Sequence, residues 1–288
     1  MRIVILTHNS DRHFYFVNRI VEETGMVVGI VTGAKRSVKK NGGLSGILKD
    51  KNLKSRLRNA ALNRIFRGCN RQLQAEKAAA ESEAFGGSKE RFLERHRDLV
   101  LAEVGAPYPS VNDPHYVEII RRARPDAIVI MGTCLVRKKI IESAPHVINI
   151  HTGLSPYYRG GMTNLWPIVL GEYGYFGVTI HRISLGIDSG DIIYTARPEI
   201  RPDDTYGTIN SRCIQLGTDL MIQAIRRLAA GEMRAMPQWT KGKLFFDRDM
   251  NGWIACRYLR NRRRFLEEYC RRQTAGELDD VRLVNSGL

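Results

Sequence analysis

The sequence predicts an α/β fold in which a doubly wound, mainly parallel sheet carries a helical insertion and a short C-terminal tail. Residues 1–32 and 113–150 alternate short apolar strands with segments of helical periodicity, which is the pattern of β-α-β units. Every residue of 127–131 is apolar, as in a strand that is covered on both faces. Of the 288 residues, 43% are hydrophobic and 26% are charged, a composition typical of folded proteins.

The chain opens with a strand, a short helix and a second strand. Residues 2–7 form the predicted first strand, and Asn9 or Ser10 can cap the helix that follows. Apolar residues recur at helical spacing until Gly25, and residues 26–32 form the second strand. The turn after the first strand contains no glycine, so it carries neither a dinucleotide-binding fingerprint nor a P-loop.

Residues 34–105 are predicted to be an insertion. It contains a basic helical stretch at 35–71, an alanine- and glutamate-rich stretch at 74–83, and a second helical run at 89–104.

After the insertion the alternation of strands and helices returns. We divide the chain into a main domain at 1–230 and a partly helical extension at 231–288. The predicted helices are 113–122, 138–142, 206–230 and 253–272, and the predicted strands are 127–131, 147–150, 177–183 and 191–196.

Basic residues are concentrated in two segments of a chain whose formal net charge is +15. Residues 35–71 hold twelve basic residues against one acid, and 257–272 hold seven arginines against two glutamates. Such segments attract acidic partners, although a solvated surface without a partner explains them equally well. Phe66 is the one aromatic residue of the first segment, which disfavours base stacking and specific nucleic-acid binding.

An apolar stripe runs through the basic segment. Leu53, Leu57, Ala61 and Ile65 recur at helical spacing among the arginines. The stripe permits peripheral contact with an anionic lipid surface, but packing on the protein core is the more common use of such a face and is the favoured interpretation.

Cysteine spacing and hydropathy limit the cellular setting. The five cysteines form no C-x-x-C pair, so neither a zinc site nor a disulfide framework is indicated. No apolar run has the length of about 18 to 20 residues that a membrane span needs, and the first residues form a strand rather than a signal peptide. We expect a cytoplasmic protein without a metal site.

Polar residues gather where the strand 147–150 ends. Asn149 and His151 are two positions apart, so on an extended chain their side chains leave the same face. Asp188 lies in a later turn flanked by glycines. An amide, an imidazole and a carboxylate can stabilise an oxyanion and move a proton, although each residue also has a structural explanation. No serine or cysteine lies in a G-x-S-x-G elbow, which favours direct attack by an amine over an acyl-enzyme.

The order of the motifs around these residues resembles the 10-formyltetrahydrofolate-dependent formyltransferase family. The resemblance is dense from about 125 to 200 and weaker in the insertion and the tail. In order, the motifs are Asn149-x-His151, Pro156-Tyr157-Tyr158-Arg159-Gly160, Trp166, Gly177-Val178-Thr179-x-His181, and the run Gly186-Ile187-Asp188-Ser189-Gly190-Asp191-Ile192-Ile193.

The resemblance implies a Rossmann-like formyltransferase domain with Asn149, His151 and Asp188 as its catalytic trio. An acceptor amine would attack the formyl carbon of the co-substrate 10-formyltetrahydrofolate. Asn149 and protonated His151 would stabilise the oxyanion, while Asp188 would hold His151 and assist proton transfer.

The resemblance also implies binding residues by position. The residues expected to contact the folate are Met131, Gly132, Cys134, Leu135, Val136, Leu185, Gly186, Ile187 and Gly190. The residues expected to contact the acceptor are His8, Asn9, Ser10, Tyr158, Arg159 and Gly160.

Departures from the family pattern bear on the acceptor. Gly153-Leu154-Ser155-Pro156 stands where Ser-Leu-Leu-Pro is common, and Thr163 stands where a proline is common. His8-Asn9-Ser10 replaces the glycine-rich phosphate loop of glycinamide ribonucleotide transformylases. Because the predicted catalytic domain starts at Met1, we expect no regulatory domain of the kind found in the formyltetrahydrofolate hydrolases, and with 58 residues after position 230 we do not expect the β-barrel of methionyl-tRNA formyltransferases.

By elimination, the expected acceptor is a small, phosphorylated amine, and the chain is most similar to the sugar N-formyltransferases that act on nucleotide-linked amino sugars. One alternative is an amino acid or a natural-product amine such as hydroxyornithine. An alternative of another class is a basic protein that binds nucleic acid or a membrane surface through an inactive core. A homodimer is compatible with each.

Overall fold

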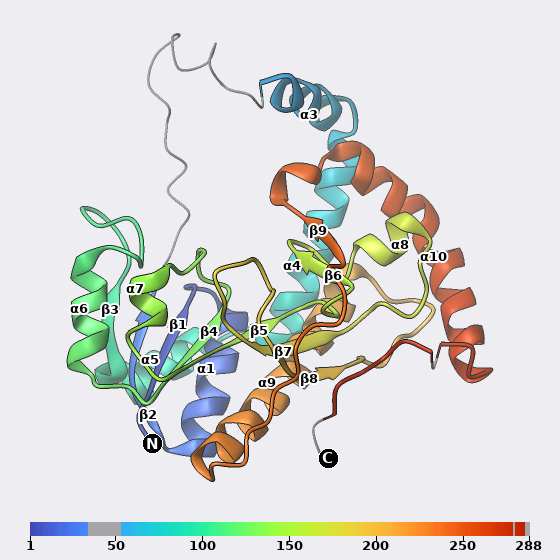
Figure 1. The fold of residues 1–288 in the computed structure, drawn as a ribbon. Coiled ribbons are helices and arrows are strands. Elements are labelled where there is room, and N and C mark those ends of the chain that lie inside the picture. The colour runs from blue at the N-terminus through green and yellow to red at the C-terminus, as the bar shows by residue number, and fades with distance from the viewer. Residues whose placement is uncertain (34–52, 279, 286–288) are drawn as a thin grey trace.

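The computed structural model describes residues 1–33, 53–278 and 280–285 (Figure 1). Its centre is a seven-stranded sheet in the order β3-β2-β1-β4-β5-β7-β8, with helices on both faces. The strands from β3 to β5 are parallel, whereas β7 runs antiparallel to β5 and β8 runs antiparallel to β7. The predicted doubly wound, mainly parallel sheet is confirmed. The strands are β1 Ile3–Thr7, β2 Val27–Thr32, β3 Val100–Glu103, β4 Ala127–Met131, β5 His146–His151, β7 Val178–Arg182 and β8 Ile192–Ala196.

Two apolar layers hold the helices against the sheet. One layer contains α1, α4, α5, α8, α9 and α10, and the other contains α6 and α7. A small second sheet pairs β6 with β9 above the ends of the central strands (Figure 1). The bounds are α1 Asp11–Thr24, α3 Leu53–Ile65, α4 Arg67–Phe85, α5 Ser88–His96, α6 Pro114–Arg122, α7 Lys138–Ile141, α8 Trp166–Leu170, α9 Tyr206–Ala229, α10 Gly252–Thr274, β6 Tyr158–Gly160 and β9 Lys243–Phe245.

The helix α1 follows its sequence pattern closely. Its apolar positions are buried, and it ends at Gly25, whose φ of 63° is the left-handed conformation that glycine adopts without strain. Ser10 occupies the N-cap position, but its hydroxyl lies 2.7 Å from Nδ1 of His13 and caps no backbone amide.

The long helix α9 is pressed onto the sheet at a glycine. A Cβ atom at Gly217 would lie 2.5 Å from side-chain carbons of both Ile150 and Val178, which belong to β5 and β7. At its N-terminus, Thr205 and Thr208 form a reciprocal capping box. The predicted helix at 206–230 is therefore present and is fixed over the two strands that carry the polar motifs.

The structure differs from the predicted insertion at 34–105. Residues 34–52, which include Lys49 and Lys51, lie outside the described residues. The helical run expected at 89–104 ends in a short 3₁₀ turn, and Val100–Glu103 forms β3, which pairs with β2. The half-buried alternation of this short strand suits a sheet edge. Leu73 and Phe92 belong to the main core, so α4 and α5 are part of the principal fold.

The apolar stripe of α3 does not pack on the core as expected. Leu57 and Ile65 expose 63% and 71% of their surface. The helix instead meets α10 and its preceding turn through polar contacts. Asn59 donates to the carbonyl of Arg248 at 2.5 Å, and the amide of Gly252 donates to Oδ1 of Asn63 at 2.7 Å. Helical spacing identified the face correctly but could not show that the apolar side lacks a packing partner within the described chain.

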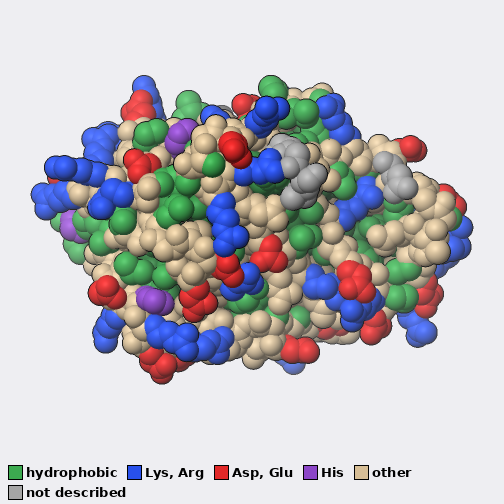
Figure 2. Space-filling view, turned by 90° about the horizontal axis from the view of Figure 1, so that it is seen from below, with side chains coloured by type: hydrophobic (Ala, Val, Ile, Leu, Met, Phe, Trp, Pro, Cys, Tyr) green, Lys and Arg blue, Asp and Glu red, His purple; other side chains and the backbone are tan. Residues whose placement is uncertain are grey.

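One face of the molecule mixes charges of both signs. On the face shown in Figure 2, Lys and Arg side chains lie among Asp and Glu side chains rather than forming one uniform basic field. Among the residues described, no helix has the length and apolar character needed to cross a membrane.

Candidate active site

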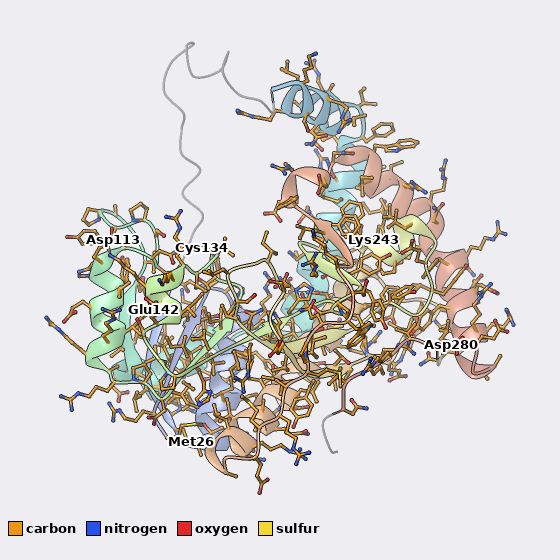
Figure 3. The ribbon with its side chains drawn as sticks, viewed as in Figure 1. Met26, Asp113, Cys134, Glu142, Lys243 and Asp280 are labelled. Carbon is orange, nitrogen blue, oxygen red and sulfur yellow. The ribbon has the colours of Figure 1, made fainter. Side chains whose placement is uncertain are left out.

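A cleft of about 910 Å³ opens at the carboxyl ends of β1, β4 and β5. The chain order reverses between β1 and β4, and open α/β sheets bind their ligands at such a switch point. In Figure 3, Cys134 in the loop after β4 and Lys243 in β9 both lie above the central strands, Cys134 toward the left and Lys243 toward the right. The walls come from the strand ends, from α1, α4 and α9, and from the tail at 245–248.

The structure brings Asn149, His151 and Asp188 together on the wall of this cleft. Asn149 and His151 stand at the end of β5, and Asp188 comes from the turn between β7 and β8. Nδ1 of His151 lies 3.4 Å from Oδ2 of Asp188. The spacing seen in the sequence therefore corresponds to a contiguous group of side chains.

Both ring nitrogens of His151 face oxygen atoms. Nε2 lies 3.0 Å from the carbonyl oxygen of Tyr158, while Nδ1 faces Asp188. Burial lowers the pKa of His151 below its ordinary value, although the Asp188 carboxylate acts in the opposite direction. The carbonyl of Tyr158 and the carboxylate of Asp188 both favour a proton on the ring nitrogen that faces them, and burial opposes this effect.

Asp188 is held as a carboxylate. Burial alone would raise its pKa, but His151, His181 and the amide of Gly160 outweigh burial and hold the pKa well below the usual range. The Gly160 amide donates to Oδ2 at 2.8 Å. The backbone of Asp188 has a φ of 44°, a left-handed conformation in which aspartate is more common than most residues.

A second histidine connects the amide and the carboxylate. His181 faces Asn149 across the paired strands β5 and β7. Its Nδ1 donates to the carbonyl of Arg182 at 2.8 Å, so its Nε2 can accept a hydrogen bond from Nδ2 of Asn149 at 3.1 Å. The same Nε2 lies 3.6 Å from Oδ1 of Asp188. His181 belongs to the motif Gly177-Val178-Thr179-x-His181, but its position between Asn149 and Asp188 becomes visible only in the structure.

Buried polar side chains fix the loop that follows His151. Thr179 donates to the carbonyl of Gly153 at 2.7 Å and accepts from the amide of Ser155 at 2.9 Å. Asn164 donates to the carbonyls of Thr152 and Gly177 at 3.1 and 3.0 Å, and it accepts from the Gly177 amide at 2.9 Å. Thr179 and Asn164 therefore fix the loop after His151 through buried hydrogen bonds.

Thr163, which stands where a proline is common in the family, also holds the loop after His151. Its hydroxyl donates to the carbonyl of Thr152 at 2.6 Å, a contact that a proline could not make.

The tail supplies a positioning residue that the sequence analysis missed. Gln238 donates to the carbonyls of Asp188 and Gly190 at 2.8 and 2.9 Å, and so holds both ends of the turn that carries the carboxylate. A Cβ at Gly190 would lie 1.8 Å from the carbonyl oxygen of Arg182, so only glycine fits there. No local sequence signal points to Gln238, because it lies about fifty positions beyond the turn.

Most of the residues expected to contact the folate line the cleft. Leu185 and Gly190 do not belong to its wall, and Leu185 exposes 75% of its surface at the tip of its loop. The expected residues found on the wall are Met131, Gly132, Cys134, Leu135, Val136, Gly186 and Ile187.

The residues expected to contact the acceptor are divided. His8 and Gly160 line the cleft, whereas Asn9, Ser10, Tyr158 and Arg159 are not among the described residues of its wall.

Two of these residues are already engaged elsewhere. The Tyr158 hydroxyl donates to Glu172 within the fold. The guanidinium of Arg159 donates to the carbonyls of Lys241 and Ile187 at 2.9 and 3.5 Å. Arg159 thereby holds the tail and the Asp188 turn, and neither side chain lines the cleft.

A family model described as "Formyl transferase" matches residues 74–225, which is just over half of the chain. The chain belongs to the formyl transferase family. The match includes the whole segment from Asn149 to Asp188, so the family predicted from the motifs is confirmed.

Individual relatives agree with the family. The methionyl-tRNA formyltransferase of Syntrophus aciditrophicus (strain SB) is 34% identical over 132 residues, which cover 45% of this chain and 42% of that protein. The match thus spans less than half of this curated relative.

Solved structures share the fold. A sugar N-formyltransferase from Shewanella sp FDAARGOS_354 has a TM-score of 0.55 and 16% identity, over 90% of this chain and 88% of that one. An N-formyltransferase from Helicobacter canadensis, in complex with folinic acid and dTDP-3-aminofucose, has a TM-score of 0.52 and 15% identity, over 93% and 82%.

Proposed function

We propose that this protein transfers a formyl group from 10-formyltetrahydrofolate to a primary amine. The observation that carries the proposal is the convergence of Asn149, His151 and Asp188 on one cleft, within the segment that matches the family. The cleft is large enough for two ligands, since it has about 910 Å³. The Helicobacter canadensis structure holds folinic acid together with an amino-sugar nucleotide, which supports a folate donor.

In the proposed reaction, the amine nitrogen forms a bond to the formyl carbon, and the bond from that carbon to N10 of the folate breaks. A proton leaves the amine and reaches N10, so the products are a formamide and tetrahydrofolate. Asn149 has one amide hydrogen on His181, which leaves the other for the developing oxyanion. His151 carries the proton transiently and is stabilised while charged by Asp188.

We propose a nucleotide-linked amino sugar as the acceptor. The sugar N-formyltransferases among the structural neighbours support this choice, because their folds extend over most of this chain. The sequence relatives are methionyl-tRNA formyltransferases, which makes initiator methionyl-tRNA the competing acceptor to test.

We also propose that the catalytic unit extends beyond position 230, because Gln238 and residues 245–248 contribute to the site.

The test is an assay of tetrahydrofolate release with four kinds of acceptor: amino-sugar nucleotides, free amino acids, N-hydroxyornithine and initiator methionyl-tRNA. We expect release only with an amine present, and the highest kcat/KM with a sugar nucleotide. Release with none of these amines would refute the formyl transfer. A higher kcat/KM for methionyl-tRNA or an amino acid would refute the sugar acceptor alone.

A further inference from the structure

The cleft contains a second polar cluster that the proposed chemistry does not use. Arg12 comes from α1, Lys77 from α4 and Asn210 from α9, and all three line the wall. None belongs to the trio or to the segments expected to contact the folate. We refer to these three residues as the α1/α4/α9 cluster.

Two polar atoms of this cluster have unmet hydrogen-bonding capacity. Asn210 is 3% exposed, and within the described chain its Oδ1 has no hydrogen-bond partner. The Nε of Arg12 is likewise buried without a partner among the described residues. A buried carbonyl oxygen without a donor costs about 1–3 kcal/mol, so a ligand hydroxyl or N–H at Asn210 would remove that cost.

The cluster carries an excess of positive charge. Arg12 lies 2.7 Å from Oε1 of Glu81, and Nζ of Lys77 lies 3.7 Å from the same oxygen. Two cations therefore share one carboxylate. Burial and the neighbouring Arg12 lower the pKa of Lys77, although Glu81 acts in the opposite direction. Burial also lowers the pKa of the adjacent His13, which is therefore neutral. An anion in the cleft would complete this arrangement.

Lys77 lies at the cleft because α4 packs closely against α9. A Cβ at Gly207 would lie 2.9 Å from Cα of Lys77 and 2.8 Å from the carbonyl oxygen of Glu76. Glycine thus allows the backbone of α4 to touch α9 one turn before Asn210. Arg262 of α10 holds the other side of α4 through an ion pair with Glu76 at 2.6 Å. The contact holds α4, which carries Lys77, against α9, which carries Asn210, and both side chains line the same cleft.

We infer that the α1/α4/α9 cluster binds the acidic end of the acceptor, with acidic oxygens on Arg12 and Lys77 and a neighbouring hydroxyl or N–H on Asn210. The inference rests on the proposed function, and it places acceptor recognition on α4, a helix from the segment predicted to be an insertion. A phosphate linked to a hydroxylated sugar supplies both groups. An amino-acid carboxylate supplies the same acidic oxygens, and the experiment separates these two sources.

The experiment compares Lys77→Met, Lys77→Arg and Asn210→Leu with the control Arg71→Met, which removes a cation from an exposed position of the same helix. Isothermal titration calorimetry measures the binding of dTDP, UDP and L-ornithine, with folinic acid as the probe of the donor half. We expect Lys77→Met and Asn210→Leu to weaken dTDP or UDP binding at least tenfold. Lys77→Arg should restore most of the affinity, while folinic acid binding stays within twofold in all variants.

In the release assay, the same two variants should raise the KM for the best acceptor and leave kcat within a few-fold. If the variants weaken the binding of L-ornithine but not of dTDP or UDP, the cluster binds the carboxylate of an amino acid and not a phosphate. Binding of every anion at wild-type affinity in both variants would overturn the inference. If the wild type releases no tetrahydrofolate but Lys77→Met still weakens nucleotide binding, the proposed function is refuted and the anion site is supported.

Discussion

Asp188→Asn separates the charge of the trio from its shape. The asparagine can keep the oxygen that accepts from the Gly160 amide at 2.8 Å, and its new amide group lies where Oδ1 now faces Nε2 of His181 at 3.6 Å. Asparagine also tolerates the φ of 44°. The turn should therefore keep its conformation while His151 loses the carboxylate that opposes the effect of burial on its pKa.

The expected loss follows from that change. Without the carboxylate 3.4 Å away, the imidazolium that forms during proton transfer has no opposite charge next to it. A positioned acid–base group contributes about 10²- to 10⁴-fold, so kcat should fall by that factor, or roughly 3–5 kcal/mol in activation free energy. Because burial then lowers the pKa of His151 further, any acid limb of the pH–rate profile should move to lower pH.

The assay is tetrahydrofolate release at saturating donor and acceptor from pH 5 to 9. Asp219→Asn is the matched control, because it makes the same change at an exposed carboxylate paired with Arg19. Both variants should fold cooperatively and bind folinic acid as the wild type does. An Asp188→Asn rate within threefold of wild type across this pH range would refute the catalytic role of the carboxylate.

Three further perturbations test the surroundings of the site. Asn164→Leu strips buried partners from Gly177 and Thr152 and should lower the free energy of unfolding by roughly 2–4 kcal/mol in urea titration; a loss below about 0.5 kcal/mol would contradict the assigned contacts. Gln238→Ala should lower kcat about tenfold, because the Asp188 turn loses two hydrogen bonds. Gln238→Asn should not restore kcat, because its shorter side chain does not reach the two carbonyls. An unchanged kcat in Gln238→Ala would show that the turn keeps its conformation without Gln238. Acid should destabilise the wild type more than Asp188→Asn. The folded-state pKa of Asp188 is depressed, so its contribution is present above about pH 4 and is lost as the pH falls through the folded value; equal acid sensitivity of the two proteins in chemical denaturation would count against that shift.

The sequence predicted those strands, helices and residue spacings that depend on neighbouring residues in the chain. The apolar run of β4, the periodicity of α9 and the two-residue spacing of Asn149 and His151 depend on neighbours in the chain, and each could be identified from sequence. Lys77 and Gln238 reach the site only because segments far apart in sequence pack together, in one case through the absence of a side chain at Gly207. Packing of that kind leaves no periodic signal.

The same distinction explains the assignments that differed. Of the motif Tyr158-Arg159-Gly160, only Gly160 lines the cleft, because the two large side chains bond to Glu172 and to the Lys241 carbonyl, and sequence spacing gives no orientation for a three-residue strand. The 89–104 segment contained a strand too short for its alternation to stand out from a neighbouring helix.

The pairing of β6 with β9 separates two parts of the tail. Residues 243–245 form the pairing and must be retained, whereas residues 246–248 lie beyond it and can vary. Gly160 holds Asp188 through its amide and faces Phe245 so closely that a Cβ would lie 1.9 Å from the Phe245 carbonyl oxygen. A mutation at Gly160 therefore disturbs the carboxylate and the attachment of the tail together. Phe246 and Arg248 lie just beyond this ladder and line the cleft, so changes there alter its wall while the ladder stays intact. For engineering a new acceptor preference, residues 246–248 are the positions to randomise, with 243–245 kept constant.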